Sequence, residues 1–167
     1  MRIAHSIATL AIVATTLGTA RHASAERYGL TAGTIEVLNA PSPSHAAVYA
    51  NGGGFALFAP SDRLAIIPGL ALEYSPDVEA WGVVASCVFD VPIPGTPLGA
   101  DLVALLLHDQ LGGDFANASL YVGGGLGGSW FIDDHWTFSL AWNYYRGVRK
   151  PVALNSMGPT AFVSYAW

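Results

Sequence analysis

The seven residues Ala161-Phe-Val-Ser-Tyr-Ala-Trp167 alternate regularly in side-chain character. One set of alternate positions holds Ala161, Val163, Tyr165 and Trp167. The other set holds Phe162, Ser164 and Ala166. A period of two predicts a β-strand whose two faces meet different surroundings. An exposed terminal strand with an aromatic ring would promote aggregation in water. The pattern therefore favours a strand that is covered by protein or lipid.

Seven further segments upstream have the same strand-like character, and no long stretch has helical periodicity. They are rich in apolar, β-branched and aromatic residues, and clusters of Gly, Pro, Asp or Asn separate them. Together with the last segment, the pattern predicts strands near residues 28–38, 46–58, 64–75, 80–89, 102–108, 118–132, 136–145 and 158–167.

The segment at 136–145 shows the alternation most clearly. Its even-numbered positions are large and apolar, whereas its odd-numbered positions from Thr137 to Asn143 are small or polar. The segments at 64–75 and 80–89 alternate in a similar way. Because the second face is small rather than strongly charged, we expect it to line a narrow barrel interior that is packed with side chains.

The composition indicates a membrane protein without membrane-spanning helices. Hydrophobic residues make up 52% of the chain and charged residues 11%, and the mean hydropathy is +0.41. Soluble domains carry roughly 25% charged residues. A deficit of this size usually indicates membrane-spanning helices, but after residue 25 no run approaches the roughly 18 apolar residues that such a helix needs. A transmembrane β-barrel resolves the conflict because it spreads its lipid-facing residues over many short strands.

The charged residues fall almost entirely between the predicted strands or at their ends. Only Glu36 and Glu73 lie within them. A charge on the lipid face costs about 2–4 kcal/mol at mid-membrane, so a membrane barrel must confine charge to its connections. The chain therefore predicts an all-β fold, an eight-stranded antiparallel up-and-down transmembrane β-barrel. The net charge of −5 gives no basic stripe of the kind that nucleic-acid-binding proteins carry.

The first 25 residues have the pattern of a cleaved secretory signal peptide. Arg2 supplies the positive start, an apolar stretch follows, and Ala23-Ser24-Ala25 matches the small-x-small cleavage pattern. We therefore expect export, with residues 1–25 as the signal peptide and residues 26–167 as one outer-membrane β-barrel domain.

Connection lengths predict how the barrel is oriented. If both termini lie in the periplasm, residues 59–63 and 133–135 are the short periplasmic turns, and the longer outer loops include residues 39–45 and 109–117. The segment 91–101 is long for a periplasmic turn. Aromatic residues near the strand ends predict two girdles at the membrane surfaces. Those expected at the outer rim include Tyr121, Tyr144 and Tyr145.

The motifs that could carry chemistry have simpler structural explanations. The run Gly123–Gly128 has the G-x-G-x-x-G spacing of nucleotide-binding loops, but a strand rather than a helix is predicted after it, so close strand packing explains it better. None of His45, His108 and His135 has a partner at metal-ligand spacing. Asp133-Asp134-His135 reads as a polar turn. We expect no enzymatic activity, no cofactor and no metal.

Three charged residues could form an ion cluster inside the barrel. Glu36, Glu73 and Arg146 all fall near the outer ends of predicted strands. If all three point inward, their charges would be paired in the lumen. The alternative is that they lie at the wet rim without fixed partners.

From residue 26 to Trp167 the chain resembles the small eight-stranded bacterial outer-membrane barrels of the OmpA/OmpX type. The resemblance rests on the terminal pattern Ala161–Trp167 and on the Gly-rich hairpin 121–142 with its Asp133-Asp134 turn. It implies a place in the outer membrane, contact with outer-membrane lipid and lipopolysaccharide, and assembly by the barrel assembly machinery. In that family the machinery reads the terminal aromatic strand. Val163, Tyr165 and Trp167 would then carry the assembly signal.

A barrel of eight strands leaves an interior just wide enough for side chains, so we expect no open pore. The leading interpretation is a structural or surface-interaction protein of the outer membrane, whose surface ligand the sequence does not name. The first alternative is a lipid A-modifying enzyme. The deacylase family among small barrels has a His-x-Ser pair, and none of His45, His108 and His135, the histidines that remain after the predicted cleavage, has that serine. The second alternative is a soluble lipocalin-like barrel that binds an apolar ligand, which inward-pointing aromatic faces would favour.

Overall fold

The computed structural model describes residues 27–39, 46–76, 80–111, 119–149 and 155–167, and the predicted signal peptide lies outside them. These residues contain no helix long and apolar enough to cross a membrane. They form eight strands, which are β1 (Arg27–Asn39), β2 (Ala46–Ser61), β3 (Leu64–Ser75), β4 (Ala80–Pro92), β5 (Leu98–Leu111), β6 (Ser119–Phe131), β7 (Trp136–Arg149) and β8 (Asn155–Ala166).

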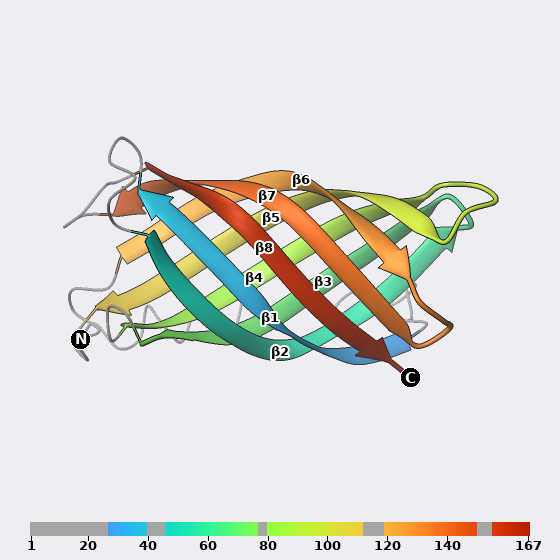
Figure 1. The fold of residues 1–167 in the computed structure, drawn as a ribbon, viewed down its shortest axis with the longest axis horizontal. Helices are drawn as coiled ribbons and strands as arrows, with labels where there is room; N and C mark the ends of the chain where they lie inside the picture. Colours follow the sequence, from blue (N-terminus) through green and yellow to red (C-terminus); the bar gives the residue numbers. More distant parts are fainter. Residues whose placement is uncertain (1–26, 40–45, 77–79, 112–118, 150–154) are drawn as a thin grey trace.

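The strands form a closed barrel in which each pairs antiparallel with its neighbours in sequence, as Figure 1 shows. Closure comes from pairing of β1 with β8, where Gly29 lies opposite Ala166 and Gly33 opposite Phe162. The backbone N–H of Trp167 extends this seam by donating a 2.9 Å hydrogen bond to the carbonyl of Tyr28. Closure leaves no free sheet edge. The predicted fold class, an eight-stranded antiparallel up-and-down barrel, is confirmed.

The two ends of the barrel differ. At one end, which we call the turn end, lie the start of β1, Trp167 and the connections at residues 62–63, 93–97 and 132–135. At the opposite end, the loop end, β1, β3, β5 and β7 finish. The strands are strongly tilted against the long axis (Figure 1), as closure of an eight-stranded sheet requires.

Alternate residues of each strand face the interior, which we call the lumen, and an outward wall. In β7, Ala141, Asn143 and Tyr145 are buried, whereas Trp142 and Tyr144 between them are about half exposed. The alternation therefore assigns the two faces of β7 as the sequence predicts. The same holds for β3, β4 and the terminal strand β8.

Strands β4 and β5 run further than the sequence predicts, because the predicted segments 80–89 and 102–108 stop short of the hairpin. The connection is only residues 93–97, where Gly95 takes a positive φ of 75° and the N–H of Ile93 donates to the carbonyl of Leu98 at 2.8 Å. The predicted long connection at 91–101 is therefore wrong. The prediction assumed that charged residues mark connections between strands. Asp90 and Asp101 instead lie within β4 and β5 and face the lumen.

Candidate functional site

The proposed assembly residues lie together in one outward row, Val163 and Tyr165 on β8 and Trp167 directly after it. Trp167 is 58% exposed and Val163 43% exposed, and Tyr165 lies between them in the same row. The Tyr165 ring packs against Trp136 and Trp167, with ring centroids 4.9 Å and 6.4 Å away. The terminal strand thus presents a continuous apolar and aromatic row at the turn end.

The predicted ion cluster does not bring Glu73 and Arg146 together. The side chain of Glu73 is only 2% exposed and points into the lumen. Arg146 is exposed, and its backbone lies opposite the outward-facing Val122. Because the two side chains point to opposite faces of the wall, the lumen cluster is wrong for this pair. The side chain of Glu36 lies outside the described part of the structure.

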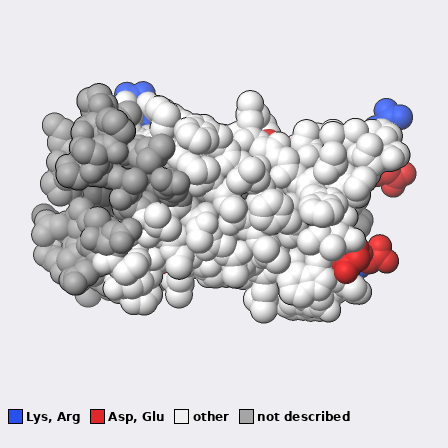
Figure 2. All heavy atoms as spheres, in the orientation of Figure 1, with Lys and Arg blue, Asp and Glu red and all other residues white. Residues whose placement is uncertain are grey.

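The outward wall is apolar and almost free of charge. Within the strands, Arg146 is the only charged residue on this face among the side chains that the structure describes, and it lies near the loop end. Figure 2 shows an almost uncharged side wall, with charged atoms gathered at the two ends of this view. The exposed apolar residues include Leu72, Leu102, Leu126, Leu140 and Trp142.

All five tryptophans of the chain belong to this outward wall. Trp81, Trp130, Trp136, Trp142 and Trp167 are each between 43% and 58% exposed. Tyr144 is also exposed, as the predicted outer girdle requires. Two other members predicted for that girdle are placed wrongly, because Tyr145 is 1% exposed and Tyr121 packs against the buried core of the lumen.

The lumen is filled at one end and hollow at the other. Towards the loop end it is packed with side chains that are at most 6% exposed, namely Ile35, Tyr49, Glu73, Ser75, Tyr145 and Ser156. Towards the turn end it contains a cavity of about 400 Å³. Small lumen residues such as Ala71, Ser86 and Ser164 line this cavity. The prediction of an interior packed with side chains is thus correct for only part of the barrel.

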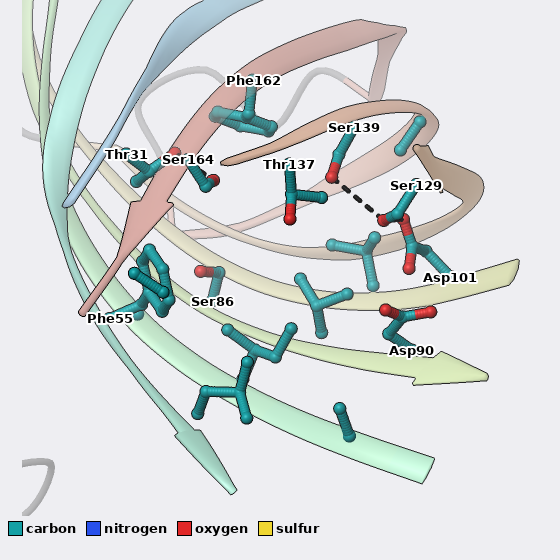
Figure 3. Close-up of a pocket in the computed structure, with 18 of the residues that line it drawn as sticks. Thr31, Phe55, Ser86, Asp90, Asp101, Ser129, Thr137, Ser139, Phe162 and Ser164 are labelled. Atoms are coloured by element: carbon teal, nitrogen blue, oxygen red, sulfur yellow. Dashed lines mark hydrogen bonds between the residues drawn. The ribbon is translucent and has the colours of Figure 1, made fainter. Parts of the chain in front are cut away.

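An acidic pair lies inside the barrel, and the sequence prediction missed it. Asp90 and Asp101 face each other across the β4–β5 pair and are 2% and 4% exposed. The hydroxyl of Ser129 donates a 2.6 Å hydrogen bond to Oδ2 of Asp101, and the Ser139 hydroxyl lies 3.0 Å from Ser129 (Figure 3). The alternation of β4 indicates where Asp90 points. Asp90 lies four residues after the inward-facing Ser86, so both side chains are on the same face of the strand.

The turn between β6 and β7 is organised by Asp133. Its Oδ1 accepts hydrogen bonds from the backbone N–H groups of His135 at 2.7 Å and Trp136 at 2.8 Å. These two hydrogen bonds hold the pKa of Asp133 below its ordinary value of 3.8, and the bond from His135 contributes most. The ring Nδ1 of His135 lies 2.8 Å from the carbonyl of Ala166. The interpretation of Asp133-Asp134-His135 as a polar turn is confirmed.

Among the described residues, no group of three or more His, Cys, Asp or Glu side chains could hold a metal ion. The Gly123–Gly128 run lies wholly within β6, and the strand continues to Phe131. The close strand packing predicted for it is confirmed, because a Cβ added at Gly125 would collide with the carbonyl of Trp142 and with Asn143.

Comparison with known proteins shows the fold and little sequence similarity. No protein-family model and no curated protein sequence matches the chain. The N-terminal β-barrel domain of Pseudomonas aeruginosa OprF is similar with a TM-score of 0.58 and 11% identity, over 84% of this chain and 97% of that one. Neisserial surface protein A is similar with a TM-score of 0.54 and 16% identity, over 88% and 100%. The de novo designed protein TMB2.3 is similar with a TM-score of 0.51 and 12% identity, over 83% of this chain and 94% of that one. By its fold, the chain is a small eight-stranded antiparallel β-barrel of the kind found in bacterial outer membranes.

Proposed function

We propose that the protein is an integral protein of the bacterial outer membrane with a structural or surface-interaction role. The observation that carries this proposal is the outward wall, which is apolar and, among the described side chains of the strands, has Arg146 near the loop end as its one charged residue. A soluble domain rarely exposes so large a continuous apolar surface, because water penalises it. Lipid is the environment that such a surface requires.

The dimensions support a spanning barrel. The strands are 12 to 16 residues long, and a tilted strand needs about 9–11 residues to cross the hydrocarbon core. Exposed aromatic rings lie near both ends, for example Trp136 at the turn end and Trp81 towards the loop end. Aromatic rings favour the headgroup level. We place the turn end in the periplasm, because short turns are typical of that side.

The packed part of the lumen supports the absence of an open pore. Tyr49, Glu73 and Tyr145 are buried in the lumen towards the loop end and do not line the cavity at the turn end. The surface role is assigned to the connections at the loop end, which would meet lipopolysaccharide or another molecule outside the cell. Export by a signal peptide and assembly by the barrel machinery belong to the same proposal.

The distribution of tryptophan supports the membrane over a soluble lipocalin-like barrel. A carrier of that kind turns its large aromatic faces towards the ligand, whereas all five tryptophans here face outward. Some aromatic rings do point inward, such as Phe55 and Phe162, but they belong to a lumen that is partly filled.

Three measurements on expressing cells test the proposal. The protein should be recovered with the outer membrane after carbonate extraction, and its gel mobility should shift on heating, because a closed barrel resists detergent until it is boiled. An epitope tag inserted between residues 112 and 118 should bind antibody on intact cells, whereas a tag inserted at 62–63 should need permeabilised cells. Recovery in the soluble periplasmic fraction would contradict the membrane location. Exposure of only the 62–63 tag would contradict the orientation.

A further inference from the structure

The cavity at the turn end of the lumen has the size and shape of a ligand pocket. Its volume of about 400 Å³ lies in the range of small-molecule sites, and residues from all eight strands line it. The packed layer of Tyr49 and Tyr145 lies beyond its inner end. Arg27, Asp134 and His135, all at the turn end, also line it. The cavity is thus a pocket with a mouth at the turn end.

The carboxyl groups of the pocket and its two labelled aromatic rings lie apart. Asp90, Asp101, Ser129 and Ser139 come from the consecutive strands β4 to β7 and lie together on one side of the cavity (Figure 3). Phe55 of β2 and Phe162 of β8 lie away from them, towards the other side. The remaining lining includes aliphatic side chains such as Ile67, Val88 and Val103, and uncharged polar ones such as Thr31, Ser86 and Ser164. A ligand that matches this division has an apolar body and one polar head.

The polar side holds two buried carboxyl groups, and no described cation acts on them. Asp90 and Asp101 are almost fully buried, and Oδ1 of each has no hydrogen-bond partner in the described structure. Among the described residues, the groups that act on them are each other and the Ser129 hydroxyl, and none is a cation. Arg27, at the mouth, instead donates from its guanidinium to the backbone carbonyl of Asp134. Buried carboxyl groups without a cation are costly, and two adjacent ones cannot both ionise without repulsion.

The two buried carboxyl groups and the apolar lining disfavour other classes of ligand. A fatty acid would bring a third carboxylate to Asp90 and Asp101, which like-charge repulsion disfavours. A calcium ion takes six to eight oxygen ligands. Most of the surface that lines the cavity is apolar, so it does not suit such an ion. An ammonium group needs only a few acceptors and gains charge-assisted hydrogen bonds from carboxylates.

We propose that this pocket binds a small apolar molecule with a single cationic amine, which enters from the turn end. The ammonium group lies between Asp90 and Asp101, within reach of the Ser129 hydroxyl. The hydrocarbon body lies against Phe55, Phe162 and the aliphatic lining. Binding pairs the two buried carboxyl groups with a cation and fills the empty part of the lumen.

The test uses the refolded barrel in deuterated detergent micelles, labelled at Ile, Leu and Val methyl groups, with n-octylammonium as the probe. We expect saturable shifts and intermolecular nuclear Overhauser effects at the lumen residues Ile67, Val88 and Val103. The outward residues Leu102 and Leu140 provide the internal control, because they contact the micelle and report simple partition of the amine. Octanol and octanoate, which match the chain length, should produce much weaker lumen shifts or none.

Two variants separate the carboxyl groups from the cavity. The double variant Asp90→Asn/Asp101→Asn keeps the side-chain shapes and should weaken octylammonium binding by about tenfold or more. Ser86→Leu leaves both carboxyl groups in place but fills part of the cavity, so it should also reduce binding. Saturable shifts confined to Leu102 and Leu140 would overturn the proposal. Equal lumen binding of octanol, or unchanged affinity in the double variant, would do so as well. Because all readings come from a folded barrel, none of these results depends on the cellular location.

Discussion

The backbone N–H of Trp167 lies 2.9 Å from the carbonyl oxygen of Tyr28 and donates to it. This bond joins the last residue of the chain to the first described strand at the turn end. The side chain of Trp167 points the other way, onto the outward wall, where it is 58% exposed. The same residue therefore contributes its backbone to closure and its ring to the apolar surface. These two contributions can be separated by mutation.

Trp167→Ala should impair assembly in cells more than stability in vitro. The variant keeps the backbone bond to Tyr28 and loses only an exposed ring, so refolded protein should lose at most about 1 kcal/mol of unfolding free energy. If the terminal row is read during assembly, the heat-shiftable fraction in the outer membrane should fall. Trp130→Ala is the matched control, since Trp130 is 52% exposed but lies on β6. Equal assembly of the two variants would remove the recognition role from Trp167.

Gly125→Ala should destabilise the barrel, whereas Gly52→Ala should be tolerated. A Cβ at Gly125 would collide with the carbonyl of Trp142 and with Asn143, but a Cβ at Gly52 has its nearest neighbour at 3.8 Å. Overpacking of this kind costs about 1–3 kcal/mol. Urea unfolding in lipid vesicles, followed by tryptophan fluorescence, measures the difference. If the two variants unfold at the same urea concentration, β6 and β7 are not packed as closely as described.

The Asp133 turn should make the stability of the barrel depend on pH in the acidic range. The pKa of Asp133 is lower in the folded chain than in the unfolded chain, because His135 and Trp136 donate to its carboxylate. Its stabilising contribution is therefore fully present above the unfolded pKa of about 3.9 and is lost as pH falls through the lower folded value. Carbon-13 detection of the Asp133 carboxyl should give a midpoint below 3.8.

Asp133→Asn provides the control for this titration. Asparagine keeps a side-chain oxygen that can accept the same two hydrogen bonds, but it does not ionise. The stability difference between wild type and Asp133→Asn should shrink as pH falls through the folded pKa of Asp133. A difference that stays constant from neutral pH to about pH 2 would show that the charge of Asp133 contributes nothing to the turn.

The sequence predicted most of the wall correctly because the alternation of side chains is a local signal. The faces of β3, β4, β7 and β8 follow directly from a period of two. The same parity also placed Arg146 on the row of Trp142 and Tyr144, which faces outward. The predicted cluster with Glu73 failed because position near a strand end was given more weight than parity. The prediction that Tyr145 lies in the outer girdle is wrong for the same reason, because its position in the alternation of β7 puts it in the lumen.

The acidic pair and the cavity were harder to predict. Asp90 and Asp101 lie close to prolines, and charged residues near proline are typical of connections between strands. They meet only because β4 and β5 pair in a particular register. The cavity depends on the summed volume of inward side chains from eight strands, which no local pattern reports. The hollow part of the lumen is thus a property of the closed barrel.

The central claim is that the outward wall of this barrel lies in lipid, and the fluorescence of Trp142 tests it most directly. Trp142 lies about midway along β7 and is 53% exposed, whereas Trp136 begins that strand at the turn end. Two single-tryptophan proteins, with the other tryptophans changed to Phe, would be refolded into vesicles of lipids brominated at defined acyl-chain depths. We predict that Trp142 is quenched most by bromine deep in the chains and Trp136 most by bromine near the headgroups. Absence of lipid quenching at Trp142 would contradict a membrane-spanning barrel.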